Sequence, residues 1–349
     1  MQEAADYVLK RLGIDKIDLS IVEGSGLLDL SDHLFREAGD SVKIISLHDI
    51  PHSPVPTAIG HKQELLYAVM QGRRTIIWNG RIHYYEGYRV THQAFPAYLS
   101  AYMGCSVFIT TNAAGFINQK MAIGDLALIT DHISMINKSY DGVVTFDEQL
   151  FNNHGLLSTS KIYDKEMVDL TREAFVESGV KLTEGPYCYF ALPNYESPAE
   201  IQIMHGLGAA TVGASTLPEQ IACFMTGMRR VIISSATSPS AGMSSEAIDG
   251  EEVLIGGAKC VANFAKVIPK LVSKLDNSFF AKTRPDKLSF PSKSHQNINL
   301  TRVNLILTLI FRKGLERFQC SSFSRKTCKD YYFKDRRRVK VYTVLLVDE

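Results

Sequence analysis

The chain has 349 residues, 45% of them apolar, so it can bury one large core or two smaller ones. This composition excludes disorder for most of its length, and a formal net charge of +1 argues against a general polyanion-binding surface. The charge is uneven along the chain. Residues 280–349 hold 16 Lys and Arg against 6 Asp and Glu, or +10, whereas residues 1–279 carry −9.

Six cysteines are scattered along the chain, and none forms the close pairs of a zinc site or a redox motif. We therefore expect reduced thiols in a cytoplasmic protein. The N-terminus lacks the continuous apolar stretch of a signal peptide, and the longest apolar run, 305–311, is too short to span a bilayer. The sequence thus predicts no membrane association.

Strand and helix patterns alternate along residues 1–279, as is typical of an α/β protein. Apolar residues at helical spacing predict an opening helix over 4–12 that ends at Gly13. Strands are expected at 17–22, 42–47, 65–70, 74–79, 105–111, 126–130, 187–191 and 231–235. Helices are expected at 93–103, 165–180, 198–207, 218–226 and 251–275. We interpret this span as one domain built on a mostly central sheet.

The composition changes after about Asn277, where Ser, Lys, Asn and Gln cluster and the basic run Arg336, Arg337, Arg338 follows. A nucleic-acid-binding arm is one interpretation, because clustered arginines attract phosphates. We favour a basic extension over 280–349 that is poorly ordered or non-homologous, and we do not expect a nucleic-acid partner.

Two segments carry groups suited to an anion. The strand at 17–22 runs into Gly24, Ser25 and Gly26, where backbone amides and a hydroxyl can turn toward a phosphate. Arg81 then offers a planar fork for phosphate oxygens, with His61 and His83 as further donors. Each feature alone also fits a structural turn or a satisfied histidine, so the prediction depends on their convergence.

Three further segments suit a flat heterocycle or close a phosphate site. Residues 110–115 follow an apolar strand with small side chains, where ligands collect in open α/β sheets. Tyr195 and Glu196 precede a helix, and they offer either a stacking face with a carboxylate or a simple helix cap. Ser215 and Thr216 likewise precede a helix, whose N-terminus favours negative charge, and an N-cap explains them equally well.

In this order, the five segments resemble the trimeric, low-molecular-mass purine nucleoside phosphorylases over roughly residues 4–275. The likeness is most specific at 80–88, 112–115 and 213–219. The related methylthioadenosine phosphorylases share the scaffold, but the first two stretches look more like the purine nucleoside enzymes. The resemblance implies a three-layer α/β sandwich, with a central mixed, partly barrel-like sheet flanked by helices, and a homotrimer.

The resemblance also implies phosphorolysis, in which a purine nucleoside and inorganic phosphate give the free base and a pentose 1-phosphate, with no metal or organic cofactor. By matching position, the phosphate contacts would be Ser25, His61, Arg81, His83, the Ala113 backbone and Ser215. The nucleoside would contact Tyr85, Ala114, Gly115, Tyr195, Glu196, Gly213, Ala214 and Ser238. Glu196, His83 and Ser238 would act in catalysis, and Glu86 would orient His83.

Several positions depart from the family pattern. Ser238, followed by Pro239, stands where an Asn usually meets purine N7, and Gly250 stands where a His usually lies near the sugar 5′-hydroxyl. Ala214 replaces a methionine under the sugar and Leu28 replaces the second glycine of the phosphate loop. Residues 137–163 do not match the stretch that normally covers the neighbouring subunit's site.

These departures leave several hypotheses open. The first is a divergent phosphorylase active on some nucleoside, and the second is a catalytically weak paralogue that binds phosphate or nucleosides. A methylthioadenosine phosphorylase-like enzyme and an assembly or regulatory protein built on the same scaffold are the others.

Overall fold

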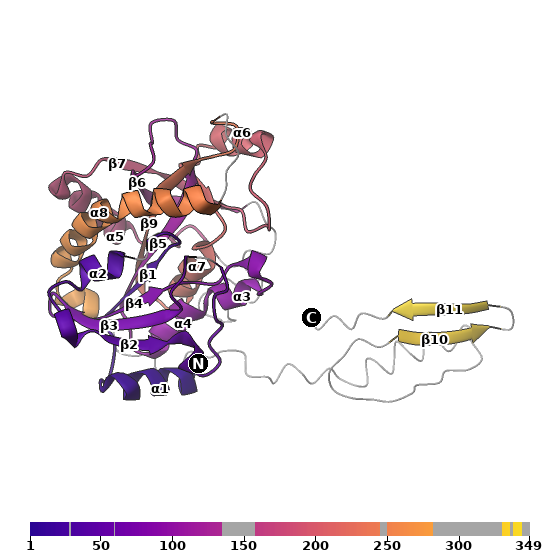
Figure 1. Cartoon of the computed structure of the whole chain (residues 1–349), viewed down its shortest axis with the longest axis horizontal. Coiled ribbons are helices and arrows are strands. Elements are labelled where there is room, and N and C mark those ends of the chain that lie inside the picture. Colours follow the sequence, from indigo (N-terminus) through magenta and orange to yellow (C-terminus); the bar gives the residue numbers. More distant parts are fainter. Residues whose placement is uncertain are drawn as a thin grey trace. The chain divides into compact units, whose positions relative to one another are not determined.

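A nine-stranded mixed sheet forms the centre of the molecule (Figure 1). The computed structural model describes residues 1–27, 29–58, 60–134, 158–244 and 250–281, and the backbone of 330–335 and 338–343. In chain order the strands are β1 (Leu19–Glu23), β2 (Lys43–Ser46), β3 (Glu64–Met70), β4 (Arg73–Asn79), β5 (Val107–Phe116), β6 (Leu126–Ser134), β7 (Leu182–Tyr189), β8 (Thr211–Gly213) and β9 (Arg229–Pro239). Their order across the sheet is β2-β3-β4-β1-β5-β8-β7-β6-β9.

An additional pairing between β5 and β9 closes half of this sheet on itself. The strands β5, β8, β7, β6 and β9 therefore form a barrel, while β1 to β4 extend from its side through the parallel pair β1 and β5. The register of β5 against β9 shifts between Ala114 and Gly115, which marks a bulge at the barrel rim. The expected mixed, partly barrel-like sheet is confirmed.

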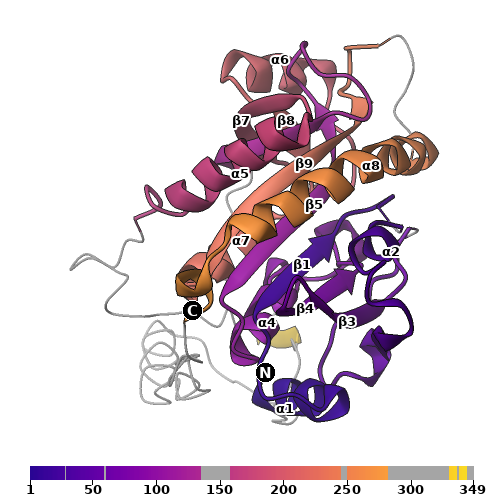
Figure 2. The same ribbon diagram turned by 90° about the vertical axis from the view of Figure 1, so that its left-hand side faces the viewer.

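Helices cover both faces of the sheet, because the strands carry buried apolar side chains on both sides. One core holds α1 (Gln2–Leu12), α3 (Val90–Gln93), α4 (Phe95–Tyr102) and α7 (Leu217–Met225). The other holds α2 (Leu30–Leu34), α5 (Lys165–Ser178) and α8 (Gly250–Lys274), the longest helix, which runs beside β9 and β5 (Figure 2). A smaller cluster packs α6 (Pro198–Gly206) against the barrel.

The expected elements recur with a few differences. The helix expected over 93–103 is divided into α3 and α4 at Ala94, because Pro96 begins a new helix at its first turn. The short strand β8 and the short helix α2 were not expected, since three to five residues carry too little periodicity to detect. The strand expected at 187–191 instead spans Leu182–Tyr189.

By its internal contacts the chain divides into residues 1–290 and 291–349. In the second unit, β10 (Asp330–Asp335) and β11 (Arg338–Thr343) pair antiparallel, which the sequence did not predict. The boundary expected at residue 280 stays a prediction, and the run 305–311 and residues 336–337 lie outside the described residues. Within the part that the structure describes, no helix is both long and apolar enough to cross a bilayer.

Two adjacent glycines let α8 approach the centre of the molecule. A Cβ added to Gly256 would lie 1.9 Å from the carbonyl oxygen of Thr237 on β9, and one added to Gly257 would lie 2.9 Å from backbone atoms of Gly26. A side chain at Gly256 must push the helix away from β9, and one at Gly257 must push it away from the loop that follows β1. The helix and this loop are therefore packed backbone against backbone.

We expect Gly257→Ala to destabilise the protein by about 1–3 kcal/mol, the usual cost of overpacking a close contact. The matched control is Gly250→Ala in the same helix, where an added Cβ meets no atom of the described residues within 4 Å and where alanine is the better helix former. Urea unfolding of both variants measures the difference. Equal stability of the two variants would contradict the close packing.

Candidate active site

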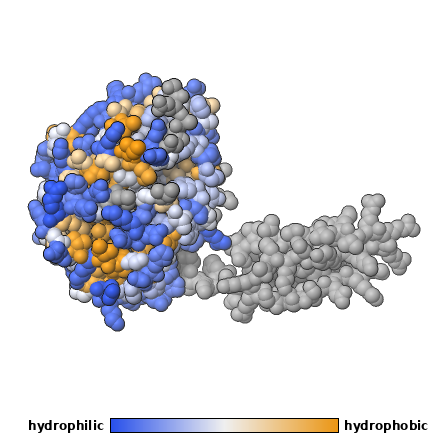
Figure 3. Space-filling model, in the orientation of Figure 1, coloured by the Kyte–Doolittle hydropathy of each residue, from blue (hydrophilic) through white to orange (hydrophobic). Residues whose placement is uncertain are grey.

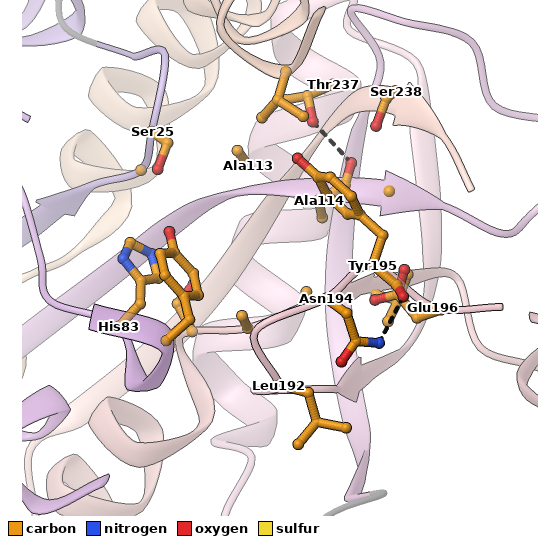
Figure 4. Close-up of a pocket in the computed structure, with 18 of the residues that line it drawn as sticks. Ser25, His83, Ala113, Ala114, Leu192, Asn194, Tyr195, Glu196, Thr237 and Ser238 are labelled. Atoms are coloured by element: carbon orange, nitrogen blue, oxygen red, sulfur yellow. Dashed lines mark hydrogen bonds between the residues drawn. The ribbon is translucent and has the colours of Figure 1, made fainter. Parts of the chain in front are cut away.

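A pocket of about 450 Å³ opens where β1, β4, β5, β8 and β9 end or meet their loops. Every site residue expected from the sequence lines it except His61: Ser25, Arg81, His83, Tyr85, Ala113, Ala114, Gly115, Tyr195, Glu196, Gly213, Ala214, Ser215 and Ser238. In Figure 4, Ser25 and His83 lie on one side of the pocket, and Asn194, Glu196 and Ser238 lie on the other. The structure thus brings together residues separated by more than two hundred positions in the sequence.

Arg81 is the most firmly held charged group of the pocket. Its Nη2 donates to the carbonyl oxygen of Thr111 (2.6 Å), and its Nη1 donates to the hydroxyls of Ser215 and Thr216 (3.1 Å each). Its Nε lies 3.3 Å from Oε1 of Glu219, and both side chains are 1% exposed. The guanidinium is therefore fixed in place, with a positive charge at one end of the pocket.

His83 is oriented by Glu86, as the sequence predicted. Nδ1 of His83 lies 3.0 Å from Oε1 of Glu86, which also accepts the His83 backbone N–H. Burial would raise the pKa of Glu86, but bonds from His83 and Thr57 lower it to about 2, so this carboxylate is ionised. The His83 ring stacks on Tyr85 with centroids 4.7 Å apart. The ionised Glu86 accepts a hydrogen bond from Nδ1–H of His83, which leaves Nε2 of the ring for the pocket side.

His61 joins this side of the site through Ser25. Its Nε2 lies 3.3 Å from the Ser25 hydroxyl, and its ring centroid is 5.4 Å from that of His83. Burial lowers the pKa of both rings, that of His61 to about 3, and the nearby Arg81 adds to the effect. Both histidines are therefore neutral at pH 7 when no anion is bound.

Thr216 does not cap α7. It makes no side-chain cap hydrogen bond, and its hydroxyl instead accepts from Arg81 and from the Asn112 amide (3.0 Å). Its backbone is held at φ +77°, ψ −50°, which is strained for a β-branched residue. The hydroxyls at 215 and 216 thus serve the arginine rather than the helix, and this excludes the simple N-cap interpretation.

Glu219 lies in the first turn of α7 and is buried behind Arg81. Burial raises its pKa to about 7, although Arg81 acts in the opposite direction. Its Oε2 has no hydrogen-bond partner within the described part of the chain. The acid is thus partly protonated near neutral pH, despite its contact with a guanidinium.

The opposite end of the pocket carries an aromatic ring and a carboxyl group (Figure 4). Tyr195 is 50% exposed, and burial raises the pKa of Glu196, with the nearby Glu200 adding to the rise. Helix α6 is capped by Ser197, whose hydroxyl accepts from the Glu200 N–H, so Glu196 is not the capping group. Glu196 therefore stays available to a ligand.

Comparison with known proteins places this pocket in a family. The profile of the "Phosphorylase superfamily" matches residues 33–273. The "Purine nucleoside phosphorylase 1" of Bacillus subtilis is 31% identical over 276 residues, covering 79% of this chain and 98% of that protein. The chain belongs to the phosphorylase superfamily and, within it, to the purine nucleoside phosphorylases.

Solved structures agree with this assignment. The purine nucleoside phosphorylase of Schistosoma mansoni in complex with adenosine superposes with a TM-score of 0.69 at 27% identity, covering 79% of this chain and 96% of that one. Isoform 2 from the same organism, in complex with cytosine and ribose-1-phosphate, gives a TM-score of 0.69 at 28% identity, with 78% and 95% coverage.

Some departures from the phosphorylase pattern can be located. Ser238 is buried in β9 and Ala214 lies after β8, and both line the pocket. Gly250 begins α8 and is exposed, whereas Val253, one turn later, lines the pocket. Leu28 and most of the segment 137–163 lie outside the described residues.

Several lining or supporting residues have no assigned role in the sequence-based prediction. Thr237 lines the pocket, as do Leu192 and Asn194 from the segment that carries Tyr195 and Glu196, and Val253 reaches it from α8. Glu219 lies in the stretch 213–219, but a carboxylate at the start of a helix is ordinarily a favourable dipole contact, so the sequence gives it no further role. Its contact with Arg81 joins positions far apart in the sequence, which no local pattern reveals. Among the described residues, no group of three or more His, Cys, Asp or Glu side chains is placed to hold a metal ion.

Glu219 should make the stability of this phosphorylase depend on pH. Its carboxyl has a pKa of 4.5 in the unfolded chain and about 7 in the folded one, so the folded state binds more protons between these values. The free energy of unfolding should therefore fall as pH rises from about 4.5 to 7, by at most about 3 kcal/mol.

In Glu219→Gln the free energy of unfolding should lack this decrease with rising pH. Urea unfolding in phosphate-free buffer at several pH values measures it. Glu251→Gln removes an exposed carboxylate from α8 and serves as the control. Its free energy of unfolding should change with pH as steeply as that of the unchanged protein. If Glu219→Gln shows that same slope, the acid is ionised throughout and the prediction is wrong.

Proposed function

We propose that the protein catalyses phosphorolysis of purine nucleosides. A phosphate oxygen forms a bond to C1′ of the pentose while the bond from C1′ to the purine nitrogen breaks. The electron pair of the broken bond leaves with the purine, which takes up a proton. The products are the free base and a pentose 1-phosphate, with inorganic phosphate as co-substrate and no metal or organic cofactor.

The observation that carries this proposal is the convergence of Ser25, Arg81, His83 and Ser215 on one end of the pocket. These groups, with His61 and the Ala113 backbone, would hold the phosphate. A bound dianion would raise the pKa of His83 and favour the ring with both nitrogens protonated, so that Nε2 donates to a phosphate oxygen. The fixed guanidinium would hold the nucleophile in position below the sugar.

The other end of the pocket supports the purine assignment. Tyr195 offers a face for stacking, while Gly115, Gly213 and Ala114 leave room for a ring close to the backbone. Negative charge develops on the departing base, so the site gains from hydrogen bonds to the base. We assign Glu196 and Ser238 as the polar side chains that bind the base. Tyr85 and Ala214 would lie against the sugar.

The alternatives are less well supported. The relatives and solved structures compared above are named purine nucleoside phosphorylases, and these names do not favour a methylthioadenosine phosphorylase-like enzyme or an inactive binding paralogue. Replacement of asparagine by Ser238 shortens the reach to the base but keeps a hydroxyl there. We therefore expect activity, with weaker stabilisation of the leaving group than an amide provides.

The direct test is incubation with phosphate and inosine, guanosine, adenosine, methylthioadenosine, uridine or cytidine. We expect free purine and an equal amount of pentose 1-phosphate, formed only when phosphate is present. Base release that does not depend on phosphate would indicate hydrolysis. Absence of base release from every purine nucleoside would refute the proposal.

Arg81→Lys tests the phosphate site without leaving Glu219 beside an uncharged residue. A lysine cannot reproduce the planar fork, so KM for phosphate should rise about 10- to 100-fold. The control is Arg89→Lys, the same substitution at an exposed arginine outside the pocket. If the two variants show the same KM for phosphate, Arg81 does not bind it.

We also propose a homotrimer that works in the cytoplasm. Tyr85, Leu192 and Tyr195 are 37–50% exposed around the pocket, and apolar side chains gather in patches on the face shown in Figure 3. The four described cysteines are free thiols, which suits a reducing compartment. Light scattering should give three times the 38.9 kDa of one chain, and a monomer would contradict the proposed assembly.

A further inference from the structure

The purine end of the pocket contains two polar side chains that have no side-chain hydrogen bond to another residue in the part of the chain that the structure describes. The hydroxyl of Ser238 and the carboxyl of Glu196 both line the pocket, and neither makes a side-chain hydrogen bond with another described residue. Ser238 is 2% exposed and lines the pocket, so a partner for its hydroxyl is expected to come from within the pocket. Both groups therefore remain for a ligand.

Two neighbours already use a donor. The Thr237 hydroxyl donates to the Ala114 carbonyl oxygen (3.1 Å), and one N–H of the Asn194 amide donates to the Tyr195 carbonyl oxygen (2.8 Å), as Figure 4 shows. Thr237 can therefore only accept a further hydrogen bond from a ligand, whereas Asn194 keeps one N–H and its amide oxygen. Neither Ser238 nor Glu196 has used any of its side-chain hydrogen-bonding capacity on another described residue.

Both of these groups can change role. A serine hydroxyl rotates to donate or to accept, and a carboxyl group accepts when ionised and donates when protonated. Burial raises the pKa of Glu196, so that its protonated form becomes accessible closer to neutral pH. The two classes of purine need such a change. A 6-oxopurine presents N1–H as donor and O6 as acceptor, whereas a 6-aminopurine presents N1 as acceptor and the amino group as donor.

We propose that the protein cleaves both 6-oxopurine and 6-aminopurine nucleosides, with Glu196 and Ser238 exchanging donor and acceptor roles between them. This inference rests on the proposed function, because it assumes that a nucleoside occupies this pocket. A site whose groups could only donate or only accept would reject one of the two classes strongly, since a buried polar group left unpaired is costly. A hydroxyl and a titrating carboxyl group carry no such fixed preference.

The groups around Glu196 support its role. The titratable side chains that act on it are Glu200 on α6 and Cys188 on β7. Bonds from Ser197 lower the pKa of Glu200, which keeps this neighbour ionised and repels a second negative charge. Burial raises the pKa of Cys188 to about 12, so it is a neutral thiol. Among the described residues, no cation is paired with Glu196.

A distinctive pH dependence follows. Inosine needs ionised Glu196 to accept its N1–H, whereas adenosine needs protonated Glu196 to donate to its N1. The ratio of kcat/KM for adenosine to that for inosine should therefore fall about tenfold for each unit of rising pH. Ionisation of phosphate and of His83 affects both substrates alike, so it cancels in this ratio.

The experiment measures kcat/KM for both nucleosides at saturating phosphate across a pH range in which neither nucleoside titrates. Glu196→Gln, whose amide can turn to donate or accept at any pH, should cleave both substrates with a ratio that no longer changes with pH. Ser238→Ala should lower kcat/KM for both substrates about 10- to 100-fold while the ratio keeps its slope. Glu219→Gln is the matched control, because it removes a carboxylate at the phosphate end of the pocket. In this variant the ratio of kcat/KM for adenosine to that for inosine should still fall with rising pH.

The outcomes separate the two proposals. If inosine is cleaved and adenosine stays below about one hundredth of its kcat/KM at every pH, the inference is overturned while the proposed function stands. A ratio that stays constant with pH in the unchanged protein removes Glu196 from the base contact. If neither nucleoside is cleaved, both the proposed function and this inference fail.

Discussion

The buried guanidinium of Arg81 connects the parts of the molecule on which the site depends. It receives support from the middle of β5 through Thr111, from the turn before α7 through Ser215 and Thr216, and from α7 itself through Glu219. Removing a charge of this kind from water is costly unless every face of the group is paired. Three segments must therefore adopt their positions together, and the strained backbone of Thr216 persists because this arrangement requires it. The phosphate end of the pocket is thus rigid before any ligand arrives.

The two histidines of the phosphate end can gain positive charge when an anion binds. Burial, with a smaller contribution from Arg81, lowers the pKa of both His61 and His83, so Arg81 is a permanent cation beside two neutral rings. A phosphate dianion would reverse this effect and draw protons onto the rings. Two carboxyl groups of this site have different pKa values. Burial raises the pKa of Glu219, whereas hydrogen bonds lower that of Glu86 despite its burial. The protein therefore places an ionised acid beside His83 and a titrating acid behind Arg81.

Much of this could be predicted from local patterns. The alternation of strands and helices, the glycine turn at Ser25, the Arg81 to Glu86 stretch and the Tyr195–Glu196 pair are visible in the sequence, because each depends on residues close together in the chain. The closure of β5 onto β9, the role of Thr216 and the contact of Glu219 with Arg81 are not visible there. Each of these features joins positions more than a hundred residues apart. From the local sequence alone, β5 and β9 are ordinary strands, Thr216 is a helix cap, and Glu219 is a favourable contact with the helix dipole. The packing of Gly257 on Gly26 is hidden for the same reason.

The two ends of the pocket are built on opposite principles. At the phosphate end, donors are fixed by hydrogen bonds to one another, which suits an anion whose charge and shape do not vary between substrates. At the purine end, Thr237 and Asn194 each donate to a backbone carbonyl oxygen, whereas Ser238 and Glu196 make no side-chain hydrogen bond with another described residue. A site that must bind one invariant co-substrate gains from rigidity there, whereas tolerance of different bases requires groups that can donate or accept. The Ser238 hydroxyl is shorter than an amide and holds the leaving base less firmly, but on this proposal it still donates or accepts as the base requires.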